Sequence, residues 1–98
     1  MIQSFKDQGT RDVFDRSRSK RAAKTCPPDL WAVAGRKLDQ LNQADALDDL
    51  RVPPRNRLEA LKGDRRGQHS IRINDQFRVC FRWTSAGPED VEIVDYHG

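Results

Sequence analysis

The sequence predicts an α+β domain in which N-terminal helices pack on one face of a mostly antiparallel sheet of four to five strands. Two observations support this prediction. Apolar residues recur at helical spacing in the first half of the chain, and they alternate with polar residues in the last third. Helices followed by a meander of strands are typical of α+β domains. The 98 residues have room for one domain, which we expect to span 1–98.

The clearest predicted helix spans 28–43. Pro28 suits its first turn, and Asp29 complements the positive end of the helix dipole. One face of this helix is apolar, formed by Leu30, Ala34, Leu38 and Leu41.

Shorter elements are expected on either side of this helix. We predict a short strand at 2–5, one or two helical turns within 7–16, and one more turn at 45–50. Pro53 and Pro54 then end the helical half, because proline lacks an amide donor and biases the preceding residue to extended geometry.

After these prolines, apolar and polar residues alternate with a period of two, which is typical of strands. Two half-buried strands are predicted at 69–74 and 77–83, and a third at 91–96 after a turn at 85–88. Residues 58–61 are a candidate fourth strand.

The register of the central hairpin follows from its apolar residues. A connection of three residues, 74–76, puts all the apolar side chains of both strands on one face, with His69 among them as a packed residue. The same register sets Arg72 opposite Arg78 on the other face, which Tyr96 joins if the third strand pairs with the hairpin. Like charges across a strand pair are tolerated best where water or an anion lies between them. The alternative is that both guanidinium groups point apart into solvent.

Charge is distributed unevenly along the chain. Residues 16–24 carry five cations and no acid, 51–82 carry nine cations and three acids, and 83–98 carry four acids and no Lys or Arg. Eight of the nine cations in 51–82 are arginines, which favours phosphate recognition because guanidinium binds phosphate bidentately. A solvated arginine-rich surface is the alternative interpretation. The stretch 16–24 is either a disordered loop or a partner contact.

Several classes of protein are excluded. No apolar run reaches the roughly 20 residues of a membrane span, and charged residues stand where a signal peptide would be apolar, so we expect a cytosolic protein. Cys26 and Cys80 are expected as free thiols. The two histidines and scattered carboxylates lack metal-ligand spacing, so we expect neither a metal nor a cofactor.

The chain ends with a possible chemical group of three side chains. Asp95, Tyr96 and His97 offer an orienting carboxylate, a donor and a base. Beside a basic sheet they would suit metal-free cleavage of RNA, whose 2′-OH is an internal nucleophile. Terminal residues are also often frayed surface residues, which is the alternative.

Five segments form a more specific combination. They read Met-Ile-Gln-Ser-Phe at 1–5, Arg-Lys-Leu-Asp-Gln-Leu-Asn at 36–42, Leu-Arg-Val-Pro-Pro-Arg-Asn-Arg-Leu-Glu at 50–59, Leu-Lys-Gly-Asp-Arg-Arg-Gly-Gln-His-Ser-Ile-Arg-Ile-Asn-Asp-Gln-Phe-Arg at 61–78, and Val-Asp-Tyr-His at 94–97. Together they resemble the HigB toxins of the RelE/ParE superfamily over nearly the whole length.

The resemblance implies a RelE-like fold and a toxin that is neutralised by a HigA-like helix-turn-helix antitoxin. Such toxins cut mRNA in the ribosomal A site without a metal, which also implies contact with ribosomal RNA. Asp95, Tyr96 and His97 match the terminal active-site motif of the family, and Arg78 matches an arginine that contacts the scissile phosphate. Glu59 lies where some relatives have a catalytic histidine, so Glu59 and His97 are both candidates for the base.

The expected reaction is attack of the mRNA 2′-OH on the adjacent phosphate, giving a 2′,3′-cyclic phosphate and a 5′-OH. Tyr96 or His97 would position or protonate the leaving oxygen. The side chains expected to bind RNA are Arg57, Lys62, Arg65, Arg66 and Arg72.

Other functions remain open on the sequence alone. A non-catalytic toxin of the same superfamily, a basic RNA-binding module and a toxin that has lost its activity are all compatible with these residues.

Overall fold

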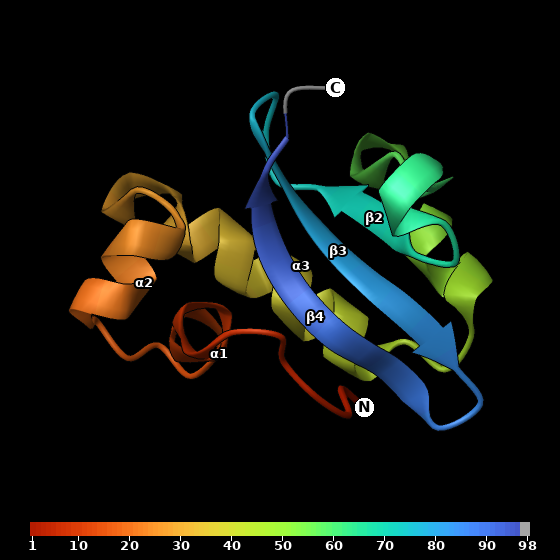
Figure 1. Ribbon diagram of the computed structural model, residues 1–98, viewed down its shortest axis with the longest axis horizontal. Coiled ribbons are helices and arrows are strands. Elements are labelled where there is room, and N and C mark those ends of the chain that lie inside the picture. The colour runs from red at the N-terminus through yellow and green to blue at the C-terminus, as the bar shows by residue number, and fades with distance from the viewer. Residues whose placement is uncertain (97–98) are drawn as a thin grey trace.

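The computed structural model describes residues 1–96 and has helices gathered on one side of a four-stranded antiparallel sheet (Figure 1). The strands follow each other in the order β1-β2-β3-β4. The predicted fold class is therefore confirmed. The α-helices are α1 (Gln8–Phe14), α2 (Lys20–Thr25) and α3 (Trp31–Gln43); the strands are β1 (Glu59–Ala60), β2 (His69–Arg72), β3 (Phe77–Thr84) and β4 (Gly87–Asp95); the short 3-10 turns are η1 (Pro28–Leu30), η2 (Leu47–Arg51), η3 (Pro54–Asn56) and η4 (Gly63–Arg65).

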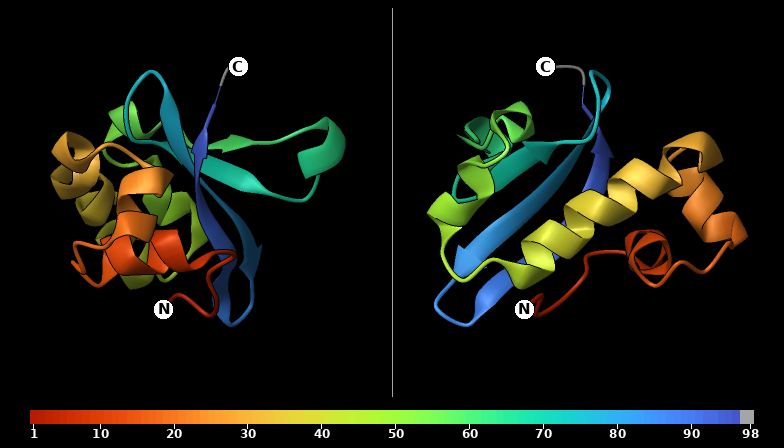
Figure 2. Two further views of the ribbon diagram at one scale, coloured as in Figure 1. Left: turned by 60° about the vertical axis from the view of Figure 1, so that its left-hand side comes forward. Right: turned by 180° about the vertical axis from the view of Figure 1, so that it is seen from behind.

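The core lies between α3 and one face of the sheet, as the view from behind shows (Figure 2). Alternation along a strand sends every second side chain to this face. Ala34, Leu38 and Leu41 of α3 are fully buried against it. The sheet side of this core consists of Ile71, Ile73, Phe77, Val79, Phe81, Val91 and Ile93. His69 lies at its rim and stacks on Phe81 with 6.3 Å between ring centroids, as expected for a packed residue.

The predicted hairpin register is also confirmed. Arg72 of β2 lies opposite Arg78 of β3, and Ser70 lies opposite Cys80. The third predicted strand pairs with β3 as β4, but it begins at Gly87 rather than near residue 91. The pairing of β3 with β4 is irregular between Cys80 and Arg82, where the register shifts.

Two N-terminal elements differ from the prediction. Residues 2–5 form only a single parallel bridge, from Phe5 to Val91, along the outer edge of β4. The stretch 16–24 is only partly a loop: residues 16–19 connect α1 to α2, and residues from Lys20 onward form α2, whose first turn is capped by the Ser19 hydroxyl accepting from the Ala22 amide. None of the helices within residues 1–96 is long and apolar enough to cross a membrane.

A buried asparagine fixes the segment that leads from α3 to β1. The Asn56 side chain is fully buried and donates to the Leu50 carbonyl and to the Gln40 side chain. Its carbonyl oxygen accepts a bond of 2.6 Å from the Lys37 ammonium group on α3. Because a buried amide is costly to leave unpaired, this network holds the 3-10 turns η2 and η3 in place. The next residues, Arg57 to Glu59, therefore start from a fixed point beside the sheet.

Candidate active site

The sheet face opposite the core carries no α-helix among the described residues and is lined with charged groups. In Figure 1 this face is turned toward the viewer, with the η4 loop beside it. Its side chains include those at even-numbered positions, Ser70, Arg72, Arg78, Cys80, Arg82, Glu92, Val94 and Tyr96, and also Glu89, which lies opposite Arg82 beyond the irregularity in pairing. Two adjoining clefts of about 340 and 310 Å³ open on it, and both are lined by Glu59 and Tyr96.

Arg78 is the centre of the smaller cleft. Its side chain is 14% exposed, and its Nη1 atom lies 2.7 Å from Oε1 of Glu59, which extends from β1. The contact is an ion pair without hydrogen-bond geometry, since Nη1 has no hydrogen-bond partner within the part of the chain that is described. The Tyr96 ring lies 4.9 Å from the guanidinium carbon, within the range of a cation–π interaction. Strand β1, β3 and the end of β4 thus bring a carboxylate, a cation and a phenol together.

Arg72 faces Arg78 across the strand pair, but it has a carboxylate of its own. It forms an ion pair with Asp75, in the turn between β2 and β3. The hydrogen bond from Arg72 lowers the pKa of Asp75, and the nearby charge of Arg57 acts in the same direction. Each of the two facing arginines is therefore neutralised by a protein carboxylate, so the repulsion expected from the register is offset within the protein itself.

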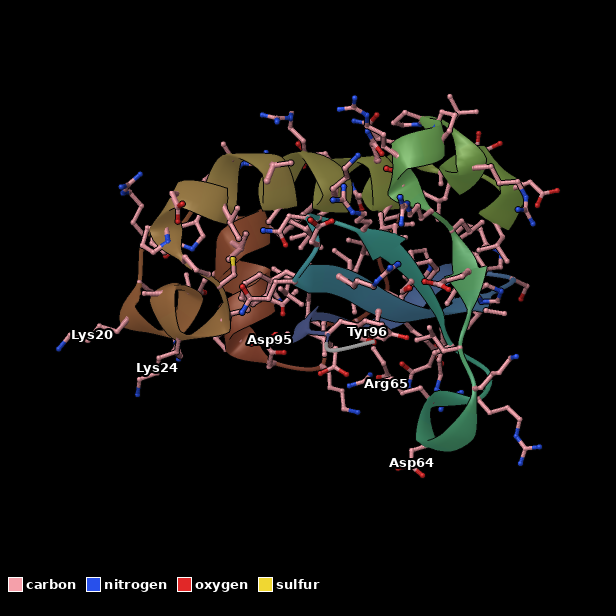
Figure 3. All side chains as sticks on the ribbon, turned by 90° about the horizontal axis from the view of Figure 1, so that it is seen from above. Lys20, Lys24, Asp64, Arg65, Asp95 and Tyr96 are labelled. Atoms are coloured by element: carbon pink, nitrogen blue, oxygen red, sulfur yellow. The ribbon has the colours of Figure 1, made fainter. Side chains whose placement is uncertain are left out.

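The η4 loop is tied to the sheet through Arg65. Its Nη1 atom donates to Oε1 of Glu92 at 2.7 Å and to Gln68 at 3.2 Å. The Glu92 side chain is only 16% exposed and lies opposite the buried Cys80 in the register of β3 and β4. The bond to Glu92 raises the pKa of Arg65. As Figure 3 shows, Arg65 thereby lies beside Tyr96, and the two side chains line the larger cleft together with Lys62.

The remaining candidate residues are more scattered. Arg57 is exposed beyond η3 with a positive φ of 46°, and Arg66 is exposed beyond η4. Asp95 is exposed, accepts a hydrogen bond from the Gln76 side chain, and lines neither cleft. His97 lies outside the described residues. Of the predicted catalytic residues, the structure brings together Glu59, Arg78 and Tyr96.

Two carboxylates of this face were not singled out from the sequence. Asp75 lines the smaller cleft with Glu59, Arg78 and Tyr96, and Glu92 anchors Arg65. Glu92 could have been found by parity, because it shares the strand face of Tyr96. Asp75 gives only a weak signal, a carboxylate three residues after an arginine in a turn.

The possible metal ligands and the two cysteines are the remaining reactive groups of the described residues. No three His, Cys, Asp or Glu side chains among residues 1–96 gather as metal ligands. Both cysteines are buried and free, as expected. Burial is the main reason that the pKa of Cys80 is raised and that of Cys26 lies at about 11.

Comparison with known proteins shows one family and two relatives. Residues 3–97 match the family model of HigB-like toxins, described as RelE-like toxins of type II toxin-antitoxin systems. The protein named Toxin HigB-1 from Vibrio cholerae serotype O1 is 37% identical over 83 residues, which is 85% of this chain and 84% of that protein. An uncharacterized protein of Haemophilus influenzae is 39% identical over 57 residues, 58% of this chain and 56% of its own length.

Proposed function

Because the chain belongs to the family of HigB-like toxins of type II toxin-antitoxin systems, we propose that it is an endoribonuclease that cuts mRNA in the ribosomal A site and so inhibits translation. Membership of this family implies an antitoxin partner. We further propose that this partner is a HigA-like helix-turn-helix protein, and that the toxin acts in the cytoplasm, where ribosomes translate.

The observation that supports a nuclease best is the group around Arg78. A guanidinium, a carboxylate 2.7 Å from it and a phenol ring 4.9 Å from it line a cleft on a sheet face that carries both arginines and carboxylates. Cleavage of RNA by its own 2′-OH needs a base, a cation for the charge that develops on phosphorus, and a donor for the leaving oxygen. These residues supply all three from different strands.

The proposed reaction follows from these roles. The carboxylate of Glu59, or the His97 imidazole, takes the proton of the 2′-OH while the 2′-oxygen forms a bond to the adjacent phosphorus. The bond from phosphorus to the 5′-oxygen breaks, and Tyr96 or His97 provides the proton that this oxygen needs. The products are a 2′,3′-cyclic phosphate and a 5′-OH. Asp95 is proposed to orient this terminal group.

Arginines stabilise the phosphorane in this scheme. Arg78 makes the main contact, and Arg72 on the neighbouring strand and Arg57 beyond η3 add positive charge. One well-placed donor of this kind contributes about 3 to 4 kcal/mol to the transition state.

The η4 loop is proposed to hold RNA through its backbone phosphates. Lys62 and Arg66 are exposed on either side of η4. We keep Arg65 in this set because a third of its side chain, 33%, stays exposed despite the pair with Glu92. Contacts of this kind add affinity for ribosomal RNA and message without sequence preference.

The proposal is tested by primer extension on a message that is translated in the presence of the toxin. We expect new 5′ ends at positions in phase with the reading frame, and none when translation initiation is blocked. Arg78→Gln should remove the bands. Arg82→Gln is the matched control, because Arg82 lies on the same face of β3 but pairs with Asp90, away from the cleft. Equal cleavage by both variants, or cleavage out of phase and without translation, would contradict the proposal.

A further inference from the structure

The ion pair between Glu59 and Arg78 joins two groups that have different tasks in the proposed reaction. To act as the base, Glu59 must be a free carboxylate near the 2′-OH, whereas the cation must contact the phosphate. In the structure they contact each other at 2.7 Å. A carboxylate and the two non-bridging oxygens of a phosphodiester present similar anionic oxygen pairs to a guanidinium. The Glu59 carboxylate thus stands where a phosphate oxygen would be bound.

The two partners differ in how firmly they are held. Arg78 extends from β3, a central strand, and its side chain is 14% exposed, with the Tyr96 ring on it. Glu59 extends from β1, a strand of two residues at the edge of the sheet, and its side chain is 47% exposed. A ligand that competes for the guanidinium therefore displaces Glu59 and leaves Arg78 in place.

The strength of the pair allows such an exchange. The Nη1 atom of Arg78 has no well-directed hydrogen bond to any described residue, so its donor capacity is unused although the atom is buried. Because the Glu59 side chain is 47% exposed, solvent screens this pair, whereas a bidentate phosphate contact to a guanidinium is strong. The buried donor is satisfied better by phosphate than by Glu59.

We infer that Glu59 occupies the phosphate position on Arg78 in the free protein, and that a bound phosphodiester displaces it, so that phosphate binding and release of the carboxylate are one event. This inference deepens the proposed function, on which its last step rests, since there the released carboxylate becomes the base. It also gives a selectivity: a ligand without an anionic oxygen leaves Glu59 paired with Arg78.

The test uses Tyr96 as a reporter. It is the single tyrosine of the chain, and its ring lies against Arg78, so selective ¹³C labelling of tyrosine gives one ring signal at the site. Inorganic phosphate is titrated first, and then a short RNA methylated at its 2′ oxygens, which cannot be cleaved. We compare wild type with Glu59→Gln and Glu59→Ala. The control is Asp64→Asn, which removes the same charge from an exposed position in η4.

We expect both Glu59 variants to bind phosphate about two- to fivefold more tightly than wild type, as loss of a competing, solvent-screened carboxylate allows. Asp64→Asn should change the affinity less than either. Adding Arg78→Gln should abolish the gain. Weaker or unchanged binding in the Glu59 variants, or an equal gain in Asp64→Asn, would overturn the inference.

Failure of the proposed function gives a different result. Phosphate titration requires no cleavage, so tighter binding by the Glu59 variants of a protein that cuts no message would leave the exchange intact and refute only the nuclease. Cleavage of message by wild type, with no gain in phosphate binding for the Glu59 variants, would support the nuclease and refute the exchange.

Discussion

The two faces of the sheet are built from alternate residues of the same strands, yet they have opposite character. On β3, Phe77, Val79 and Phe81 are buried in the core under α3. Arg78 and Arg82, between and beside them, lie on the open face and pair with carboxylates. Stability therefore depends mainly on one face, and the proposed chemistry on the other. On this strand, substitution of a residue that faces the core should therefore lower stability, whereas a substitution that lowers activity alone should lie on the open side.

The largest effect is expected on the core face. Phe81→Ala should lower the free energy of unfolding by about 3 to 5 kcal/mol, because it removes a fully buried ring and leaves a cavity. Urea denaturation followed by Trp fluorescence measures this. Its neighbour on the open face, Arg82→Gln, should cost less than about 1 kcal/mol, since its ion pair is exposed. Similar losses in the two variants would break the distinction between the faces.

The next effect is expected on the open face, in activity. Arg78→Gln should slow cleavage about 10²–10³-fold, which corresponds to about 2.7–4 kcal/mol of transition-state stabilisation. Its unfolding free energy should fall by less than that of Phe81→Ala. Rates of message cleavage and urea midpoints, measured on the same preparation, check both statements. A loss of activity that merely follows unfolding would contradict the role of Arg78.

A smaller effect is expected where the open face is covered by a loop. Glu92→Gln removes the anionic partner of Arg65 and should cost about 1 kcal/mol or less of stability. Because Cys80 is buried and lies opposite Glu92, its thiol should react faster with maleimide in the variant. Peptide mapping distinguishes it from Cys26, whose labelling should stay unchanged. Faster labelling of both cysteines would indicate general loosening instead.

The smallest effect concerns pH. Arg72 lowers the pKa of Asp75, so the pair stabilises the folded state above the ordinary pKa of aspartate, about 3.9. This contribution is lost as the pH falls below that value and through the lowered pKa. NMR titration of the Asp75 carboxyl should show a midpoint below the ordinary value, which returns toward it in Arg72→Gln. An unchanged midpoint in that variant would show that Arg72 is not the cause.

The alternation of side chains along a strand explains why the positions of the open-face residues could largely be predicted from the sequence. The pairing of Arg72 with Arg78 and the position of Tyr96 on their face follow from the period of two, which one buried face enforces over the whole hairpin. Helix α2 could not be predicted in this way, because Ala22 is its one buried residue and six residues give no period. The hydroxyl cap of Ser19 was its main signal.

The carboxylates of the candidate site were harder to predict. The partners of Arg78 and Arg65 lie on an edge strand and on β4, at no regular spacing in the sequence, and the partner of Arg72 lies only three residues away but in a turn. Periodicity gives the face of a strand residue but not the partner that a long side chain reaches. Glu59 was identified only through the resemblance to a family, and its pairing with Arg78 emerged from the structure.

The course of β4 also bears on how the protein should be handled in the laboratory. The strand runs from Gly87, which lies against Met1, to the end that carries Tyr96, so Met1 and Tyr96 lie at opposite ends of the sheet (Figure 1). A purification tag fused before Met1 is kept far from Arg78, whereas only two residues would separate Tyr96 from a tag fused after residue 98. An amino-terminal fusion is therefore the arrangement that keeps a tag away from the candidate site.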